Sequence, residues 1–375
     1  MRRRNAKGLE TIDLTVSNPT VVGFHYPRDW QEGWSGQDLH LPYAPDALGY
    51  AGARKAIAAY LQDQGMKASP ESIVLAAGTS EAYAWIFRLL GSMGDEFVAM
   101  VPGYPLCDAI AEWCGMSLFP WPWRYTSVGA WETDWLKLAQ SISSRTKALI
   151  LVHPNNPTGH YLTEGDFQRA LALAADYDLA LIVDTVFWDY CHLSTPPSPV
   201  PASEGPLVFT LGGLSKTCAL PQLKLAWMHV SGQQAKVDAA LDKLSWTADT
   251  FLSVSIPIQT LAPSLLTTRR LMQKPIRERL AENLLQASTL LGSSFELRKP
   301  QGGWSLPIGL PHGPDDEQAA IALLEREGVL VQPGYFFDFP EEGHIIISLI
   351  TPPSSLREGL NRLQRFSMHS GWIAS

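Results

Sequence analysis

Five short apolar runs alternate with helix-like segments between about residues 50 and 260. The runs cover residues 73–77, 98–101, 148–152, 179–183 and 206–211. An alternation of strands and helices is typical of α/β domains, in which helices cover both faces of a mostly parallel sheet. The pattern therefore predicts a three-layer α/β/α fold for this part of the chain.

A lysine follows the last of these runs. The segment Gly213-Leu214-Ser215-Lys216 places its amine just after a strand and a Gly-Gly turn, and a second cation, Lys224, lies eight residues further on. An amine can react with an aldehyde, and a nearby cation can neutralise a phosphate. Pyridoxal phosphate (PLP) needs both groups. Because an isolated Ser-Lys pair also occurs in surface loops, the prediction depends on companion motifs.

Two companion motifs allow a functional and a purely structural interpretation. The run 73–77 leads into Gly78, Thr79 and Ser80 at the start of a predicted helix. Free N–H groups and hydroxyls there suit a phosphate, although an ordinary N-cap explains the two hydroxyl residues equally well. The run 98–101 leads to Tyr104, which lies in Pro102-Gly103-Tyr104-Pro105. This tyrosine can form a stiff wall for a flat ring, or it can be a simple turn residue.

Two further motifs favour the functional interpretation. The loop 153–159 contains two amides, two prolines and a glycine, more than a plain turn requires. It follows a strand, and open α/β sheets bind ligands where their strands end. Asn156 in this loop can donate a hydrogen bond to a phenolate oxygen. Asp184 closes an apolar strand, where a buried carboxylate needs a partner such as a pyridinium nitrogen.

These motifs, in this order, resemble those of the fold-type I PLP enzymes, specifically the class I/II aminotransferase family. The resemblance covers nearly the whole chain. It implies that Lys216 forms a Schiff base with PLP, that Asp184 pairs with the pyridine nitrogen and that Asn156 binds the ring oxygen. Tyr104 would then stack on the ring, and the partner subunit of a homodimer would lend its Tyr43 to the phosphate. The remaining expected cofactor contacts are Gly78, Thr79, Ser80, Ser215, Lys224 and Phe187.

Three positions depart from the family pattern. Phe187 stands where the family has a tyrosine, and Lys224 where it has an arginine. The arginine that holds the substrate α-carboxylate falls on Ile346 or Ile347, depending on the register of the strand. Arg124 and the segment around Asn18 are candidate substitutes for that arginine. The third change removes the main reason to assume an α-amino-acid substrate.

The motifs and their departures predict a PLP-dependent aminotransferase that acts on an amine or an unusual amino acid, together with a 2-oxo acid. Lys216 would serve as the base for the proton shift, because a freed amine beside a cationic imine has a lowered pKa. A lyase, decarboxylase or oxidase that uses PLP is the alternative, since the usual carboxylate contact is missing. A non-catalytic PLP-binding protein is the second alternative.

The segments outside the central alternation predict a second, smaller α+β domain. We expect a large PLP-binding domain over residues 46–275, and a small domain built from residues 1–45 and 276–375. Helical character over residues 262–296 predicts a long connecting helix that is interrupted at Pro275.

Composition limits the remaining classes of protein. The net charge is −8 and the only basic cluster is at residues 2–4, so we expect no nucleic-acid partner. No apolar stretch reaches the ~18 residues of a membrane span, and no histidine pair has the spacing of a metal site. Four scattered cysteines without a C-x-x-C motif predict reduced thiols and a cytoplasmic location.

Overall fold

The structure of the protein is a computed structural model that describes residues 4, 8, 10–28, 30, 43, 45–195, 197–292, 294–310 and 315–370. Its described part contains an eight-stranded sheet with the order β2-β9-β8-β7-β6-β3-β4-β5. The strands are β2 (Ile73–Ala76), β3 (Glu96–Val101), β4 (Ser117–Tyr125), β5 (Trp131–Thr133), β6 (Thr146–Val152), β7 (Ala180–Asp184), β8 (Val208–Gly213) and β9 (Ala226–Ser231). The pairs from β4 through β3, β6 and β7 to β8 are parallel, whereas β9 is antiparallel to both of its neighbours. The predicted α/β fold with a mostly parallel sheet is confirmed.

Helices cover both faces of this sheet, because the side chains that point to either face of its central strands are apolar. In β6, the side chains of Ala148 and Ile150 pack in one apolar cluster, and those of Leu149 and Leu151 pack in the other. Successive strand residues point to opposite faces, so a strand with two buried faces is apolar throughout. The helices around the sheet are α3 (Ala51–Asp63), α4 (Thr79–Leu90), α5 (Leu106–Trp113), α6 (Trp135–Ser141), α7 (Glu164–Asp176), α8 (Leu214–Thr217), α9 (Gln234–Phe251) and α10 (Ile256–Thr268).

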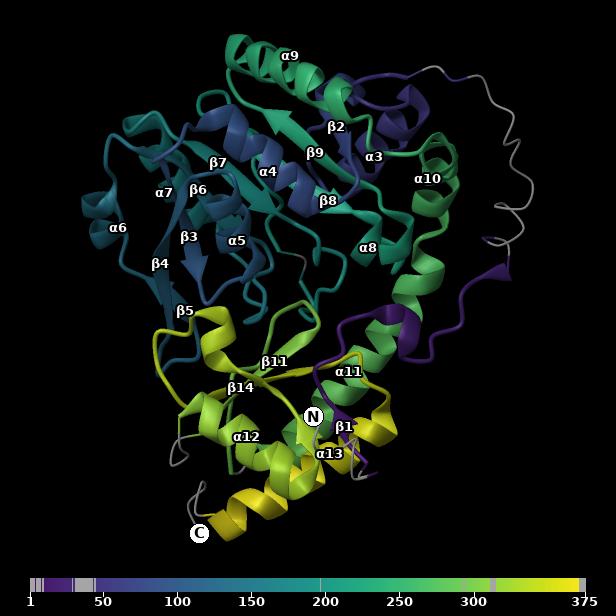
Figure 1. The fold of residues 1–375 in the computed structure, drawn as a ribbon, viewed down its shortest axis with the longest axis vertical. Coiled ribbons are helices and arrows are strands. Elements are labelled where there is room, and N and C mark those ends of the chain that lie inside the picture. The colour runs from purple at the N-terminus through teal and green to yellow at the C-terminus, as the bar shows by residue number, and fades with distance from the viewer. Residues whose placement is uncertain are drawn as a thin grey trace.

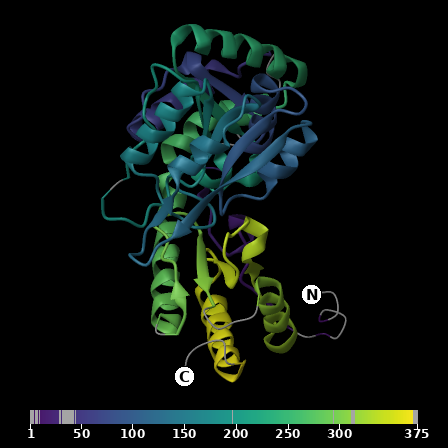
Figure 2. The ribbon, with the colours of Figure 1, turned by 90° about the vertical axis from the view of Figure 1, so that its left-hand side faces the viewer.

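A second, smaller part lies below the large sheet in Figure 1, and Figure 2 shows the two parts stacked along the long axis of the molecule. Its antiparallel sheet has the order β10-β11-β14-β13. Its elements are β10 (Glu296–Leu297), β11 (Ser305–Gly309), β13 (Gln332–Pro333), β14 (His344–Ser348), α12 (Asp316–Glu327) and α13 (Pro353–Ser370). Near the N-terminus, β1 (Ile12–Asp13) pairs with β12 (Val329–Leu330). The exact domain boundaries after residues 45 and 275 stay a prediction.

The helix between the two parts is interrupted six residues earlier than predicted. The chain turns at Arg269, between α10 and α11 (Arg270–Leu291), whereas Pro275 lies inside α11. The guanidinium of Arg269 donates to the Leu266 carbonyl at 2.8 Å and so closes the end of α10. Pro275 lies near the start of α11, where a missing N–H disturbs few helical hydrogen bonds.

Short helical turns complete the described chain. They are η1 (Pro19–Val21), η2 (Pro70–Ser72), η3 (Pro221–Leu223) and η4 (Gly334–Phe337). Among the described residues, no helix has both the length and the apolar character that crossing a membrane would require.

Candidate active site

The predicted motifs meet at one cavity of about 500 Å³. The strands β2, β3, β6, β7 and β8 run in the same direction, so the segments that follow them reach the same edge of the sheet. The smaller part closes the cavity from the other side with Trp304, Ser305, Gln332 and Ser348. The predicted residues that line the cavity are Gly78, Thr79, Ser80, Tyr104, Asn156, Asp184, Phe187, Ser215, Lys216 and Lys224.

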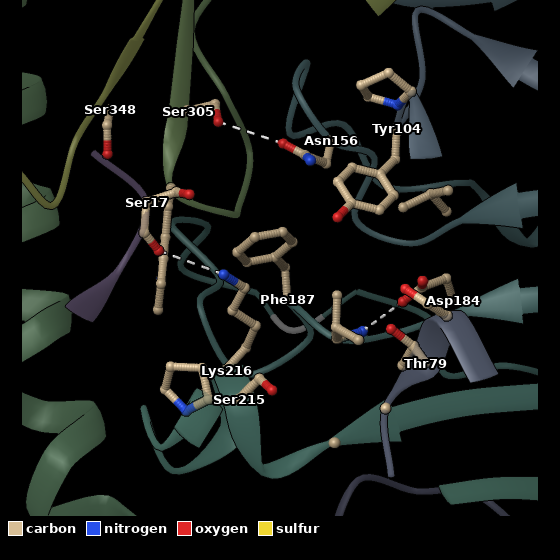
Figure 3. A pocket seen from close by; sticks show the side chains of 18 of the residues that line it. Ser17, Thr79, Tyr104, Asn156, Asp184, Phe187, Ser215, Lys216, Ser305 and Ser348 are labelled. Atoms are coloured by element: carbon tan, nitrogen blue, oxygen red, sulfur yellow. Dashed lines mark hydrogen bonds between the residues drawn. The ribbon is translucent and has the colours of Figure 1, made fainter. Parts of the chain in front are cut away.

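Lys216 points into the cavity from the short helix α8, and Figure 3 shows its amine turned toward Ser17. Its Nζ donates to the Ser17 carbonyl at 3.4 Å and lies 4.7 Å from the ring centre of Trp304. The hydroxyl of Tyr190 donates to the Lys216 carbonyl at 2.7 Å, which fixes the backbone behind the amine. Burial lowers the pKa of Lys216 to about 8, although the negative charge of Asp184 opposes this shift.

Gly212 allows the strand before Lys216 to pack tightly against β9. A Cβ atom at this position would lie 2.7 Å from the indole ring of Trp227, which is fully buried. Any larger residue would therefore push β8 and β9 apart, close to the lysine. The first glycine of the Gly-Gly pair is therefore needed for the close packing of β8 on β9, in addition to its place in the turn.

Asp184 is 6% exposed and is held by two donors. The Val186 N–H donates to Oδ1 at 3.0 Å, and the Tyr83 hydroxyl donates to Oδ2 at 3.2 Å. Burial raises the pKa of Asp184 to about 6, and these hydrogen bonds and the charge of Lys216 only partly oppose that shift. Asp184 forms no ion pair with the described residues, so its buried carboxylate can still accept a hydrogen bond from a protonated ring nitrogen.

Asn156 is oriented by a residue from the smaller part of the molecule. The hydroxyl of Ser305 donates to its Oδ1 at 3.3 Å, as the dashed line in Figure 3 shows. The amide N–H groups of Asn156 form no hydrogen bond with the described residues and can donate into the cavity. The neighbouring Asn155 donates to the Pro102 carbonyl at 3.1 Å and accepts from the Thr158 hydroxyl at 2.7 Å. The loop of Asn156 is thereby fastened to the loop of Tyr104.

The start of α4 and the side chain of Lys224 fit a phosphate. A Cβ atom at Gly78 would lie 3.2 Å from Nζ of Lys224, so this amine reaches the turn before α4. The N-terminus of a helix carries partial positive charge and free N–H groups. The Lys224 amine and the positive end of α4 repel each other unless an anion, such as a phosphate, lies between them. Thr79 and Ser80 add hydroxyls at the same place.

Tyr43 lies away from the cavity of its own chain. It is 77% exposed and lines a separate groove together with residues 45–47 and 252–257. Its predicted contact with the cofactor of a partner subunit stays a prediction.

The site also contains residues that the sequence did not predict. Tyr83 lies on α4, one turn after the Gly78 motif, and resembles any buried aromatic residue of that helix. Trp304, Ser305, Gln332 and Ser348 are ordinary residues at or beside short strands, and only the pairing of those strands brings them to the cavity.

Comparisons with known proteins agree with this geometry. Residues 41–363 match the model of the family described as aminotransferase class I and II. An alanine aminotransferase of Mycobacterium tuberculosis is 26% identical, over 97% of this chain and 87% of that protein. The glutamate-pyruvate aminotransferase AlaA of Escherichia coli is 24% identical, over 97% of this chain and 92% of that protein. An alanine aminotransferase from Pyrococcus furiosus superposes with a TM-score of 0.91 at 24% identity, over 98% of this chain and 95% of that one. The chain belongs to the class I and II aminotransferases, a family of transferase enzymes that use PLP.

Proposed function

We propose that Lys216 holds PLP in this enzyme, which transfers an amino group between an amine or unusual amino acid and a 2-oxo acid. One observation carries the proposal. An amine, a buried carboxylate, an amide and a helix start with a nearby cation all line the same cavity. These are the groups needed to hold the aldehyde, the ring nitrogen, the ring oxygen and the phosphate of PLP.

Each side chain has a definite role in this proposal. Asp184 would keep the ring nitrogen protonated, and Asn156 would donate to the ring oxygen. Tyr104 would stack on the ring, with Phe187 also contacting it. The phosphate contacts would be Gly78, Thr79, Ser80, Ser215 and Lys224. When bound, PLP supplies an aldehyde and an electron-accepting ring.

The lowered pKa of Lys216 suits it to proton transfer. At a pKa of about 8, roughly one amine in ten is neutral at pH 7, against about one in 3,000 for a lysine with the ordinary value of 10.5. A neutral amine can accept a proton, and the resulting ammonium can return it. The buried position beside Trp304 keeps the amine inside the cavity.

The substrate is expected to differ from the common amino acids. The relatives named alanine and glutamate-pyruvate aminotransferases make alanine, glutamate and pyruvate the first compounds to test. We expect low turnover with alanine, aspartate and the aromatic amino acids, because the family arginine is replaced by isoleucine. Repeated turnover with release of a carbonyl product in the absence of a 2-oxo acid would instead favour the lyase, decarboxylase or oxidase alternative, because an aminotransferase stops after one product per site without an acceptor.

We also propose a cytoplasmic homodimer with shared active sites. A groove beside α4, α5 and α9 carries Trp113 and Phe251, which are 81% and 60% exposed. Large exposed apolar side chains of this kind are typical of surfaces that a partner covers. The four cysteines are free thiols, in keeping with a reducing compartment.

Borohydride trapping tests the central assignment. The purified enzyme should be yellow, and reduction should fix the cofactor to the peptide that carries Lys216. The Lys216→Ala variant should bind PLP without such fixation. Cofactor fixed to another lysine in that variant would show that the assignment is wrong.

A further inference from the structure

The wall that the smaller part contributes to the cavity has no charged side chain among the described residues, and it combines polar residues with the aromatic residues Trp304, Phe336 and Phe337. Ser305, Gln332 and Ser348 come from β11, β13 and β14, and Thr15 and Ser17 come from the segment after β1. Figure 3 places Ser305 and Ser348 on one side of the cavity and Asp184 and Thr79 on the other, with Lys216 and Phe187 between them. The wall that faces away from the proposed phosphate contacts therefore offers hydroxyl and amide groups.

The register of β14 shows which residue replaces the family arginine. Ile345 and Ile347 pack in the apolar core, so Ile346 and Ser348 share the opposite face of the strand. Ser348 lines the cavity and is paired with Ser305, and Ile346 is paired with Gln332. The position left open by the sequence is therefore Ile346, which is fully buried.

No other cation takes the place of that arginine in the described structure. Lys216 and Lys224 are the cations among the described cavity residues, and both are assigned to the cofactor. Arg124, considered above as a substitute, is exposed and forms an ion pair with Glu341 at 2.5 Å. Arg279 donates to the Val22 and Ile350 carbonyls, at 2.6 Å and 3.3 Å.

Asn18 does not line the cavity, since it is exposed and its side-chain oxygen accepts from the N–H and the hydroxyl of Thr20. A carboxylate at the neutral wall would lose its hydration without gaining a cation, which is unfavourable.

Ser348 supplies independent evidence for a ligand at this wall. The residue is 6% exposed, and its Oγ is buried without a hydrogen-bond partner among the described residues. A buried hydroxyl without a partner is costly, so such groups are normally paired. Gln332 also lines the cavity, and its side chain forms no hydrogen bond with the described residues. A hydroxyl and an amide can each donate and accept.

We propose that Ser348 and Gln332 bind a neutral substrate group that both donates and accepts hydrogen bonds, a primary carboxamide or a hydroxyl, in place of an α-carboxylate. The inference rests on the proposed function, since it assumes that PLP occupies the lysine side of the cavity. It narrows the amino donor to amino amides and amino alcohols. A 2-oxo acid acceptor would bring its carboxylate to the same wall in the second half of the reaction, so we expect it to bind weakly. A carboxylate can only accept, and its charge has no counter-ion at this wall.

A matched series of substrates tests the proposal on the PLP-loaded enzyme. Alanine, phenylalanine and aspartate are each compared with their α-carboxamide and with the corresponding amino alcohol. Dissociation constants come from the change in visible absorbance on binding. The rate of amino-group transfer comes from the carbonyl product released in a single turnover without a 2-oxo acid, so that no acceptor carboxylate has to bind at this wall. We expect the amide or the alcohol to exceed the acid at least tenfold in both measurements. Equal or better use of the acids, or failure of the amides and alcohols to bind, overturns the proposal.

Substitutions at the wall test the residues themselves. Ser348→Ala and Gln332→Met should each weaken amide and alcohol binding about three- to tenfold, the effect of one neutral hydrogen bond. Binding of isopropylamine, which lacks the group, should not change. Ser367→Ala is the matched control, because Ser367 is a fully buried serine on α13 whose hydroxyl donates to the Leu363 carbonyl of the same helix, away from the cavity. Equal losses for isopropylamine and the amides would mean a general structural effect and would overturn the assignment.

The same samples separate this inference from the proposed function. Borohydride trapping at Lys216 reports on the cofactor site alone. If borohydride fixes the cofactor to Lys216 but the enzyme prefers amino acids to their amides and alcohols, the neutral-group proposal is wrong and the aminotransferase proposal stands. If no cofactor is fixed to Lys216, both proposals are wrong.

Discussion

Replacing Asp184 with asparagine should stabilise the cofactor-free protein at pH 8 and much less at pH 4.5. Burial raises the pKa of this carboxyl from 3.8 to about 6. A carboxyl whose pKa is raised by folding contributes its full stability below pH 3.8, and loses it as the pH rises through about 6. The linkage relation then gives a cost of about 1 kcal/mol at pH 4.5 and about 3 kcal/mol at pH 8 for keeping the carboxyl in the folded state.

Urea unfolding at the two pH values measures this cost as a shift in the transition midpoint. Asparagine keeps the shape of the side chain and an oxygen that can accept from Val186 or Tyr83. Asp238→Asn, at an exposed position on α9, is the matched control for the exchange of a carboxylate for an amide. Added PLP should reverse the order at pH 8, because the wild-type carboxylate then gains a cationic partner. An equal effect of Asp184→Asn at both pH values, or destabilisation at pH 8, would refute the reasoning.

Three further predictions concern the cofactor contacts. Lys224→Ala should weaken PLP binding by about 1–3 kcal/mol through loss of a charge-assisted hydrogen bond, whereas Lys224→Arg should retain it; equilibrium dialysis measures both. Phe187→Tyr should lower the pH midpoint of the absorbance change of the bound cofactor, because a phenol would stabilise the ring oxygen anion. Equal midpoints would mean that another donor already does so. Mixing inactive Lys216→Ala with Tyr43→Phe should restore activity in hybrid dimers, and a monomer in sedimentation would contradict the shared site.

The large sheet and its motifs were predictable because their signals are local. Apolar runs bounded by glycine, proline or polar residues mark strands, and the run predicted at 148–152 is the strand Thr146–Val152. The residues predicted to hold the cofactor directly follow such strands, so the parallel sheet was enough to bring them to one edge. The position at which the connecting helix is interrupted was less predictable. Pro275 lies inside α11, and the break between α10 and α11 depends on the hydrogen bond by which Arg269 caps α10.

The opposite wall of the cavity could not be predicted from local signals. Ser305, Gln332 and Ser348 come from three short strands, and their common wall depends on β14 pairing with both β11 and β13. The sequence limited the position of the missing arginine to Ile346 or Ile347. It could not choose between them, because a shift of one residue in strand register turns each side chain to the opposite face of the sheet. The paired strands and the apolar core together decide for Ile346. Tyr83 was missed because a core tyrosine and a carboxylate-binding tyrosine look alike in the sequence.

Burial lowers the pKa of Lys216 and raises the pKa of Asp184. Attraction between Lys216 and Asp184 would raise the pKa of the amine and lower that of the carboxyl, but desolvation outweighs it and brings the values to about 8 and about 6. Near pH 7 the carboxyl is therefore largely ionised, while a useful fraction of the amine is neutral. The charged carboxylate remains costly in the cofactor-free protein, and a protonated ring nitrogen would offset that cost. The desolvation that weakens the empty fold is thus the same effect that would favour PLP binding and keep the lysine reactive toward its aldehyde.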